Sequence, residues 1–419
     1  MKIITITKEE FEQFSNKHKY NSLYQSRNYA NFSEINDGYN VHYLGFTDDG
    51  DNLIGASLML YKTLFWGYKY AYAPRGMLID YENTEFVKEL TIKLKKLLKK
   101  QKFIFITIDP PIIASERDKN GNTLKFNNNV NQILECFKKN DYEHLGFNLY
   151  NESILPRWNV LAPLNKDPRI MFNTFDNDIK EKINYASSIA INVSIDNSLN
   201  INNFYEFIHK KYAKKGIKYF QNIIGSFNEG GKVKIFYAFL NTKQYTSNAN
   251  KLYEKEEERN KELANIIQSG NNVKYNIQKA INDKMVSDKL LHSYKKDVVT
   301  STKLLKTNPE GLILATSLVI EEAKGANMML LYYDDAYERY NAQTLLTFEI
   351  MKYYGKENYK YINLGSITGN FNSNSKYYPA LISKLGFNSS ILEYIGQFNI
   401  IINPTMYKIY LRKYNKKKE

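Results

Sequence analysis

The segment NANKLYEKEEERNKELANIIQSGNNVKYNIQKAINDKMVSDKLLHSYKKDVVTSTKLLK, residues 248–306, decides how the rest of the chain is organised. It contains no proline, a single glycine and dense charge. Two helices with thin apolar stripes can cover each other by folding back, so the segment predicts an antiparallel helical hairpin, or coiled-coil arm. The apolar residues recur at helical intervals: Leu252, Leu263, Ile266, Ile267, Ile277, Ile281, Leu290, Leu291, Tyr294, Val298 and Leu304.

The turn of this hairpin has two candidate positions. One is residues 269–272, Ser-Gly-Asn-Asn, and the other lies near Asn282 and Asp283. We favour the second position because it makes the two arms more equal in length. The first helix, residues 251–270, has a net charge of −1, from four basic and five acidic residues. The returning one, residues 271–306, has a net charge of +5, from eight lysines and three aspartates.

The composition of the whole chain excludes several classes of protein. With 419 residues, of which 43% are hydrophobic, it is long enough for two or three domains. No apolar run approaches the roughly 20 residues of a membrane span, and the N-terminus lacks the features of a signal peptide. Cys136 stands alone and the histidines are scattered, which indicates no disulfide, no metal site and a reducing cytoplasm. We expect no cofactor, and the net charge of +14 favours a polyanionic partner.

The sequence on both sides of the arm predicts mixed α/β structure. In the first half we expect strands at residues 2–6, 40–46, 53–64, 68–72, 103–108 and 158–164, and helices at 8–17, 85–101 and 130–140. In the second half we expect strands at 233–240, 311–320, 328–333 and 361–364, helices at 203–215 and 338–354, and a closing strand region at 389–401. The second half thus repeats the first in type, and residues 405–419 form a basic tail that we expect to end in disorder.

A series of short motifs follows this order of elements. Tyr72 begins the loop YAPRGMLIDY, in which Arg75 offers a two-pronged donor for phosphate or carboxylate. The other motifs are Gln25-Ser26, Ile108-Asp109-Pro110, Pro156-Arg157-Trp158, Tyr340-Asn341-Ala342, Tyr361-Ile362-Asn363-Leu364-Gly365, Lys384-Leu385-Gly386-Phe387 and Glu393-Tyr394-Ile395-Gly396. Taken one at a time, each is equally consistent with a structural turn or a buried ion pair.

In this order, with a helical arm between them, the motifs resemble the FemABX family of peptidoglycan bridge-forming aminoacyltransferases. The likeness covers nearly the whole chain and is greatest to the arm-bearing members. It implies two tandem GNAT-like domains, at residues 1–165 and at 166–247 with 307–404, with the arm at 248–306 inserted in the second. It also implies transfer of an amino acid from aminoacyl-tRNA to a free amine on the stem peptide of a peptidoglycan precursor. The precursor is either lipid-linked or UDP-linked.

The resemblance also suggests site residues. Lys384 matches the lysine of the family's Phe-Lys-x-Gly-Phe motif and would stabilise charge at the reacting centre, with Ser383 in place of the phenylalanine. Asp109 matches a strand-end aspartate that lines the precursor channel, although an aspartate that caps the turn before Pro110 is an equal alternative. The remaining candidates are substrate-binding Arg75, Tyr72, Lys215, Tyr340, Tyr361, Gly365 and Phe387, and tRNA-binding Lys284, Lys289, Lys295 and Lys296 on the arm.

Two departures from the family pattern leave alternatives open. Ser33 stands where a lysine usually meets precursor phosphate, and Lys215 stands for an arginine, which loses the two-pronged donor. A GNAT-like transferase that acts on another amine, in a protein or lipid, is therefore one alternative. A catalytically silent relative that binds tRNA or a partner through the arm is another. We expect a cytoplasmic location, with peripheral contact at the inner membrane face as a further alternative; the sequence does not define the oligomeric state.

Overall fold

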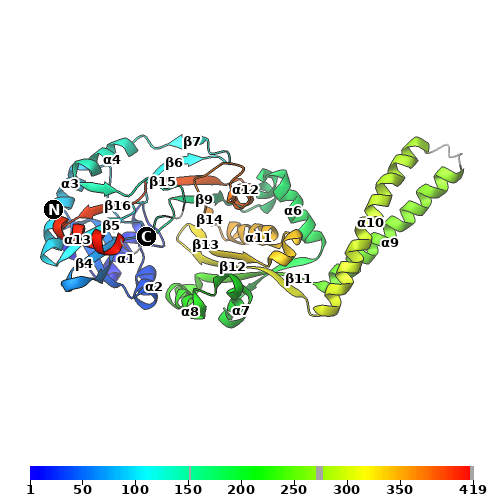
Figure 1. The fold of residues 1–419 in the computed structure, drawn as a ribbon, viewed down its shortest axis with the longest axis horizontal. Helices are drawn as coiled ribbons and strands as arrows, with labels where there is room; N and C mark the ends of the chain where they lie inside the picture. The colour runs from blue at the N-terminus through cyan, green and yellow to red at the C-terminus, as the bar shows by residue number, and fades with distance from the viewer. Residues whose placement is uncertain (151, 270–276, 416–419) are drawn as a thin grey trace.

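The computed structural model describes residues 1–150, 152–269 and 277–415. Two mixed β-sheets with helices packed on them form the body of the molecule, and a pair of long helices projects from it (Figure 1). These features confirm the expected architecture of two α/β units with a helical arm. Among the described residues, no helix is both long enough and apolar enough to cross a membrane.

The first sheet has the strand order β1-β2-β3-β4-β5-β16-β8. All neighbours are antiparallel except β4 and β5. The strands are β1 Lys2–Thr5, β2 Asn40–Thr47, β3 Leu53–Thr63, β4 Lys69–Ala73, β5 Phe103–Ile108, β8 Tyr142–His144 and β16 Phe398–Ile401. The helices of this unit are α1 Lys8–Lys17, α2 Arg27–Asp37, α3 Thr84–Lys100 and α4 Val130–Lys139.

The second sheet has the strand order β10-β11-β12-β13-β14-β9-β15-β6-β7, in which only β13 and β14 are parallel. Its strands are β6 Ile113–Arg117, β7 Thr123–Phe126, β9 Trp158–Pro163, β10 Ile191–Asp196, β11 Val233–Leu240, β12 Leu312–Glu321, β13 Gly325–Tyr333, β14 Tyr361–Ser366 and β15 Ser390–Tyr394. The remaining helices of the body are α5 Pro168–Thr174, α6 Asn177–Ser188, α7 Ile201–Tyr212, α8 Gly216–Phe227, α11 Ala342–Lys356, α12 Tyr378–Leu385 and α13 Pro404–Asn415.

The two units pass through the same elements in the same order. The first runs β1-α1-α2-β2-β3-β4-α3-β5, and the second runs β10-α7-α8-β11-β12-β13-α11-β14. The arm occupies the connection between β11 and β12, where the first unit has the short turn between β2 and β3. Helices α2, α7 and α8 pack together on these sheets around Phe32, Phe204 and Phe220.

The chain crosses between the two sheets. Strands β6, β7 and β9 follow β5 in the chain but lie in the second sheet, where β9 is placed between β14 and β15. Strand β16 comes near the end of the chain but lies in the first sheet, between β5 and β8. Residues 389–401 therefore do not close one sheet, as expected, because the chain changes sheet between β15 and β16. The expected division at residue 165 does not coincide with the division between the sheets.

Local sequence signals set several of these elements. The side chain of Thr7 accepts a hydrogen bond from the Glu10 backbone and the Glu10 carboxylate accepts one from the Thr7 backbone, and this capping box begins α1. The apolar face of α3 is buried, since Val87, Leu90, Leu94 and Leu98 are all at most 1% exposed. The C-terminal segment differs from the expectation. Instead of a tail it forms helix α13, because Met406 and Tyr407 pack against Ile104 and Phe105 of β5.

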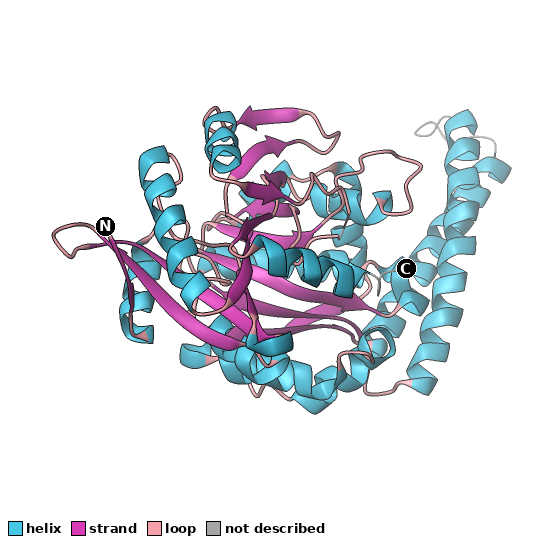
Figure 2. Ribbon diagram, turned by 60° about the vertical axis from the view of Figure 1, so that its left-hand side comes forward, coloured by secondary structure: helices cyan, strands magenta, loops and turns pink. Residues whose placement is uncertain are grey.

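The arm consists of α9 Thr242–Ser269 and α10 Ile277–Thr307, which pack along each other (Figure 2). Our preferred turn near Asn282 and Asp283 is wrong, since both residues lie inside α10. Helix α9 begins at Thr242, before the segment that we expected, and this earlier start makes α9 and α10 similar in length. The alternative position for the turn was residues 269–272, of which Gly270, Asn271 and Asn272 lie outside the described residues.

The seam of the arm contains more small and polar residues than the apolar stripe predicted. Ala280, Ser287 and Ser301 of α10 are fully buried at seven-residue multiples, which allows the helices to approach closely. Asn260 of α9 donates hydrogen bonds to Ser287 (3.0 Å) and Asp288 (2.8 Å) across the seam. Leu263 and Leu304 are buried as expected, but Leu252, Ile277 and Ile281 are exposed.

Candidate functional site

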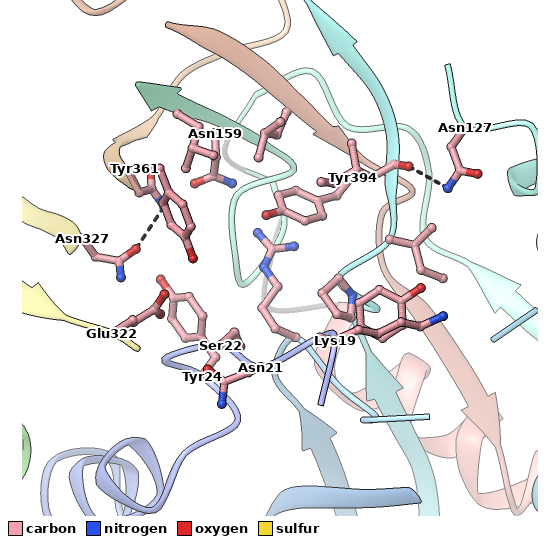
Figure 3. A pocket seen from close by; sticks show the side chains of 18 residues that line it. Lys19, Asn21, Ser22, Tyr24, Asn127, Asn159, Glu322, Asn327, Tyr361 and Tyr394 are labelled. Carbon is pink, nitrogen blue, oxygen red and sulfur yellow. Dashed lines mark hydrogen bonds between the residues drawn. The ribbon is translucent and has the colours of Figure 1, made fainter. Parts of the chain in front are cut away.

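A cavity with a volume of about 450 Å³ lies between the two units. Figure 3 shows the side chains that line it, which come from both sheets and from the loop before α2. The lining residues are Lys19, Tyr20, Asn21, Ser22, Tyr24, Arg75, Pro111, Ile112, Ile113, Asn127, Asn159, Leu161, Glu322, Asn327, Tyr361, Asn363, Leu392 and Tyr394. Two of the predicted binding residues, Arg75 and Tyr361, are therefore brought together here.

Arg75 reaches this cavity from the loop that follows β4. Its guanidinium lies 4.0 Å from the centre of the Tyr394 ring, and its Nη2 donates a hydrogen bond to the Pro156 carbonyl at 2.5 Å. The side chain is buried among these groups, since Arg75 is 6% exposed. Stacking and the hydrogen bond hold the planar donor in one orientation, which suits the binding of an anionic group.

Asp109 lies behind Arg75 and does not line the cavity. Its carboxylate accepts hydrogen bonds from the Tyr72 hydroxyl at 2.9 Å and from the Arg75 backbone. Burial raises the pKa of Asp109 to about 6, although the charge of Arg75 and these hydrogen bonds lower it. Tyr72 and Asp109 thus fix the loop that carries Arg75, and both are at most 3% exposed.

Gln25 fixes the other side of the same loop. Its side-chain amide donates to the Pro74 carbonyl at 2.7 Å and its oxygen accepts from the Leu58 backbone at 2.9 Å. A Cβ on Gly76 would lie 2.6 Å from Gln25 Nε2, so this close contact requires glycine. Ser26 begins α2 as its N-cap, and Ser33 is fully buried in that helix. The Gln-Ser motif is therefore structural here, and the position of Ser33 faces the interior.

Glu322, at the end of β12, lies on the opposite side of the cavity. One carboxylate oxygen accepts a hydrogen bond from the Leu23 backbone at 2.6 Å, which links the two units. Burial raises the pKa of Glu322, while the Leu23 hydrogen bond and the Asn327 amide lower it. Tyr24, Tyr361 and Asn327 surround this carboxylate in Figure 3.

A second, smaller cavity of about 60 Å³ lies between β13 and β14, beneath the start of α11. The two strands are paired only through Gly325–Asn327 and Tyr361–Asn363, and beyond these residues they separate. Lys384 and Phe387, which the sequence predicted as site residues, line the space that this separation leaves. The other lining residues are Met328, Leu331, Gln343, Thr344, Thr347, Leu364 and Ser383.

Lys384 reaches from α12 to the end of β14. Its Nζ donates a hydrogen bond to the Ser366 carbonyl at 2.9 Å, and burial lowers its pKa to about 8. A Cβ on Gly365 would lie 3.3 Å from this nitrogen, and Gly365 has a φ of +87°. Between Asn363 and Ser366, β14 also shifts its register against β9. The irregular end of β14 thus leaves room for a partly desolvated ammonium group.

The structure does not bring all predicted residues to one site. Lys384 lines the smaller cavity, whereas Asp109 lines neither of the two, and β14 lies between the larger cavity and Lys384. Tyr340 is 1% exposed at the base of the arm, where its ring packs 6.0 Å from that of Tyr245. Lys215 lies at the start of α8, with its ammonium 4.6 Å from the Tyr219 ring, and lines neither cavity.

The four arm lysines lie along α10. Lys284 forms an ion pair with Asp288 at 2.9 Å, one turn further along the helix. Lys289, Lys295 and Lys296 are exposed. The base of the arm is held by Thr242, whose hydroxyl donates to the Asn308 carbonyl at 2.7 Å, and by Tyr245, which contacts Asp297.

Sequence reasoning missed several cavity residues, above all Glu322, Tyr24 and Lys19. Glu322 had no signal of its own because Glu321 stands beside it and only the strand register decides which carboxylate faces the cavity. Asn363 lay inside a quoted motif but was not selected. Among the residues that the structure describes, no group of histidine, cysteine or acidic side chains could hold a metal ion.

Comparison with known proteins places the chain among a defined set of enzymes. The profile of the FemAB family matches residues 6–414. The aminoacyltransferase FemB of Staphylococcus epidermidis strain RP62A is 27% identical over 418 residues, which cover 98% of this chain and 97% of the relative. The lipid II:glycine glycyltransferase of Staphylococcus haemolyticus is 24% identical over 426 residues, with 98% and 95% covered. The crystal structure of FemX superposes with a TM-score of 0.72 at 20% identity, covering 98% of this chain and 99% of that one, and so shares its fold.

Proposed function

The chain belongs to the FemAB family of aminoacyltransferases, and from this premise we propose its substrates. It transfers an amino acid from aminoacyl-tRNA to the free amine of a peptidoglycan precursor's stem peptide and so builds the interpeptide bridge. The relative from S. haemolyticus is named for lipid II, which favours a lipid-linked acceptor. The proposal is supported by the match over residues 6–414 together with two cavities, one large and one small, that are both lined by residues of β14.

The reaction requires little of the enzyme beyond alignment and charge stabilisation. The amine attacks the ester carbonyl, a C–N bond forms, the C–O bond to the tRNA ribose breaks, and the ribose oxygen takes up a proton. The ester is already activated, so a covalent nucleophile is unnecessary. Cys136 fits this view, because it packs in α4 and contacts the Thr84 carbonyl rather than lining either of the two cavities.

We assign the acceptor to the large cavity and the aminoacyl ester to the space between β13 and β14. In the tetrahedral intermediate a negative oxygen forms, and the Lys384 ammonium is the charged donor nearest the separated strands. Its single hydrogen bond to the Ser366 carbonyl leaves two N–H groups for that oxygen. The position of Lys384 beside Gly365 is the observation that carries this assignment.

Asp109 acts in this scheme as a positioning residue. It is buried behind Arg75 and fixes the loop whose guanidinium faces the acceptor cavity. We expect Arg75, with Lys19 at the cavity rim, to meet an anionic group of the precursor. The basic helix α10 of the arm contacts the tRNA backbone in this proposal, through Lys289, Lys295 and Lys296.

We place the enzyme in the cytoplasm, in peripheral contact with the inner membrane face. The turn between β3 and β4 carries Trp66, which is 73% exposed, and the Lys413 ammonium of α13 lies 4.8 Å from the adjacent Phe65 ring. Residues 52–79 and 394–418 contain no acidic side chain. An exposed indole beside basic groups suits an anionic lipid surface. The fraction of protein that sediments with phosphatidylglycerol vesicles should be lower for Trp66→Ala than for the native protein. Neither protein should sediment with neutral vesicles. Equal sedimentation of the two proteins with phosphatidylglycerol vesicles would contradict this contact.

Transfer can be tested directly with purified protein. Charged tRNAs are incubated with lipid-linked or UDP-linked precursor, and the precursor is examined by mass spectrometry for an added residue. A mass increase that requires both charged tRNA and the free amine supports the proposal. Binding of tRNA without any mass increase, for every pairing, would instead indicate a catalytically silent relative.

A further inference from the structure

Glu322 is a carboxylate in the large cavity that lacks a cationic partner. Among the described residues it forms no ion pair, although its neighbour Glu321 is paired with Lys234 at 3.4 Å. One carboxylate oxygen of Glu322 accepts a hydrogen bond from Leu23 N–H at 2.6 Å. An amide side chain could accept a hydrogen bond from Leu23 N–H as well, so this structural role alone does not require a charge. Glu322 is half-buried, and a partly desolvated carboxylate without a counter-ion is costly, which indicates that something else uses the charge.

The cavity carries positive groups on its other side. Arg75 lines it with a guanidinium held in place by Tyr394 and Pro156. Lys19 lies at the rim, 3.4 Å from Asp80, and Figure 3 shows it across the cavity from Glu322. The cavity therefore has one acidic and one basic end. A ligand that carries an ammonium group and an acidic group would match both.

A line of polar contacts connects Glu322 with the end of β14. Asn327, which lies beside Glu322 in the cavity wall, accepts a hydrogen bond from the Asn363 amide at 3.2 Å. The Asn363 oxygen accepts one from Gly365 N–H at 2.9 Å, and Gly365 lies beside Lys384. An amine bound near Glu322 would therefore lie in the part of the cavity that leads to the proposed reacting centre.

We propose that Glu322 binds the ammonium group of the acceptor peptide and so selects substrates with a free amine. This inference rests on the proposed function and names a recognition group for it. Arg75 and Lys19 take the acidic group of the same molecule, which fixes the direction in which the peptide lies. A peptide whose amine is blocked loses the interaction with Glu322 and keeps the one with the basic end.

The test compares two soluble probes on the full chain. One is a stem pentapeptide with a free lysine side chain, and the other is the same peptide acetylated on lysine Nε. Isothermal titration should show that the native protein binds the free peptide about 10- to 100-fold more tightly, as expected for a partly buried charge-assisted contact. Glu322→Gln should lose most of this preference and bind the acetylated peptide unchanged.

Glu321→Gln is the matched control, because it removes the neighbouring carboxylate outside the cavity and should keep the preference. Thermal unfolding of Glu322→Gln checks that the fold persists; the glutamine oxygen can still accept from Leu23. If Glu322→Gln retains the preference for the free amine, or if both peptides lose affinity equally, Glu322 does not bind the ammonium group. If the native protein binds neither peptide, the proposed acceptor itself is wrong.

Discussion

The two α/β units use the same pair of parallel strands in opposite ways. In the first unit β4 and β5 stay paired along the whole of β4, from Lys69 to Ala73. In the second unit β13 and β14 separate after three residue pairs. The closed pair ends in Asp109 and a tightly bonded loop, whereas the open pair leaves a slot that Lys384 enters.

This difference explains why one fold unit can serve two roles. A closed pair gives a rigid edge that presents a loop, here the one that carries Arg75 to the larger cavity, where we propose that the acceptor binds. An open pair exposes strand backbone and leaves the space in which we propose that the aminoacyl ester binds. Both units bury an ionisable group at this edge: the pKa of Asp109 is raised to about 6 and that of Lys384 is lowered to about 8, in each case by burial.

Replacing Lys384 should give the largest effect. In Lys384→Met the developing oxyanion loses its charged donor, so we expect kcat to fall about 100- to 1,000-fold. The folded pKa lies below the unfolded one, so the buried ammonium costs stability below about pH 8. As the pH rises toward the pKa that Lys384 has in the unfolded chain, the buried group loses its proton and this cost disappears. The variant should therefore be more stable than the native protein at pH 7 by an amount on the order of 1 to 3 kcal/mol.

Single-turnover transfer and chemical unfolding measure these two quantities. Lys356→Met, on the exposed end of α11, is the control and should change neither of them. Undiminished transfer by Lys384→Met would show that the open strand pair does not hold the reacting centre.

Asp109→Asn tests the closed pair and should act on binding. Because Asp109 positions Arg75, we expect the KM for the acceptor to rise about tenfold with a smaller change in kcat. The folded pKa of Asp109 lies above its unfolded value, so ionisation lowers the free energy of unfolding as the pH rises from about 4 to about 6. The asparagine variant lacks this slope. Its stability relative to the native protein should increase over that range and then stay constant.

Unfolding curves at several pH values, with kinetics at pH 7.5, provide the measurements. A fall in kcat as large as that of Lys384→Met would mean that Asp109 takes part in the chemistry, and the two units would then share one reacting centre.

Gly365→Ala tests how much space the site between the separated strands β13 and β14 requires. The new Cβ would lie 3.3 Å from Lys384 Nζ, at a φ of +87° that side chains rarely adopt. We expect a loss of about 1 to 2 kcal/mol of stability from the backbone and a severalfold lower rate from displacement of Lys384. The same substitution at Gly38, which has a φ of +64° and nothing within 4 Å of its Cβ, is the control. Gly38→Ala should lose a similar amount of stability and leave the rate of transfer unchanged. If both variants lose the same rate, the space beside Lys384 is not what the reaction requires.

The arm should give the smallest effect, and one that depends on salt. Replacing Lys284, Lys289, Lys295 and Lys296 by glutamine should weaken tRNA binding about tenfold at low ionic strength and less at high salt. Filter binding over a range of salt concentrations measures this, with stem-peptide binding as the control. If the salt dependence is the same as in the native protein, the arm does not contact tRNA electrostatically.

The sequence predicted the order of elements better than their arrangement. Helical spacing, the capping box at Thr7 and the motifs around Arg75 and Lys384 act over short distances, so they could be recognised. Strands β9 and β16 have no local feature that says in which sheet they pair, and their exchange depends on packing across the whole molecule. Glu322 and the buried serines of the arm were missed for a related reason: their role comes from what faces them, not from their neighbours in sequence.

The exchange of β9 and β16 also affects how the protein is made. Strand β16 lies between β5 and β8, so the first sheet lacks an interior strand until residue 401 has been synthesised. The facing edges of β5 and β8 therefore stay unpaired during translation until almost the whole chain has been synthesised. A chain that terminates even after β15 still lacks β16 and leaves the first sheet incomplete. Premature termination would thus give no folded fragment, and we expect chaperones to bind the incomplete chain and proteases to degrade it.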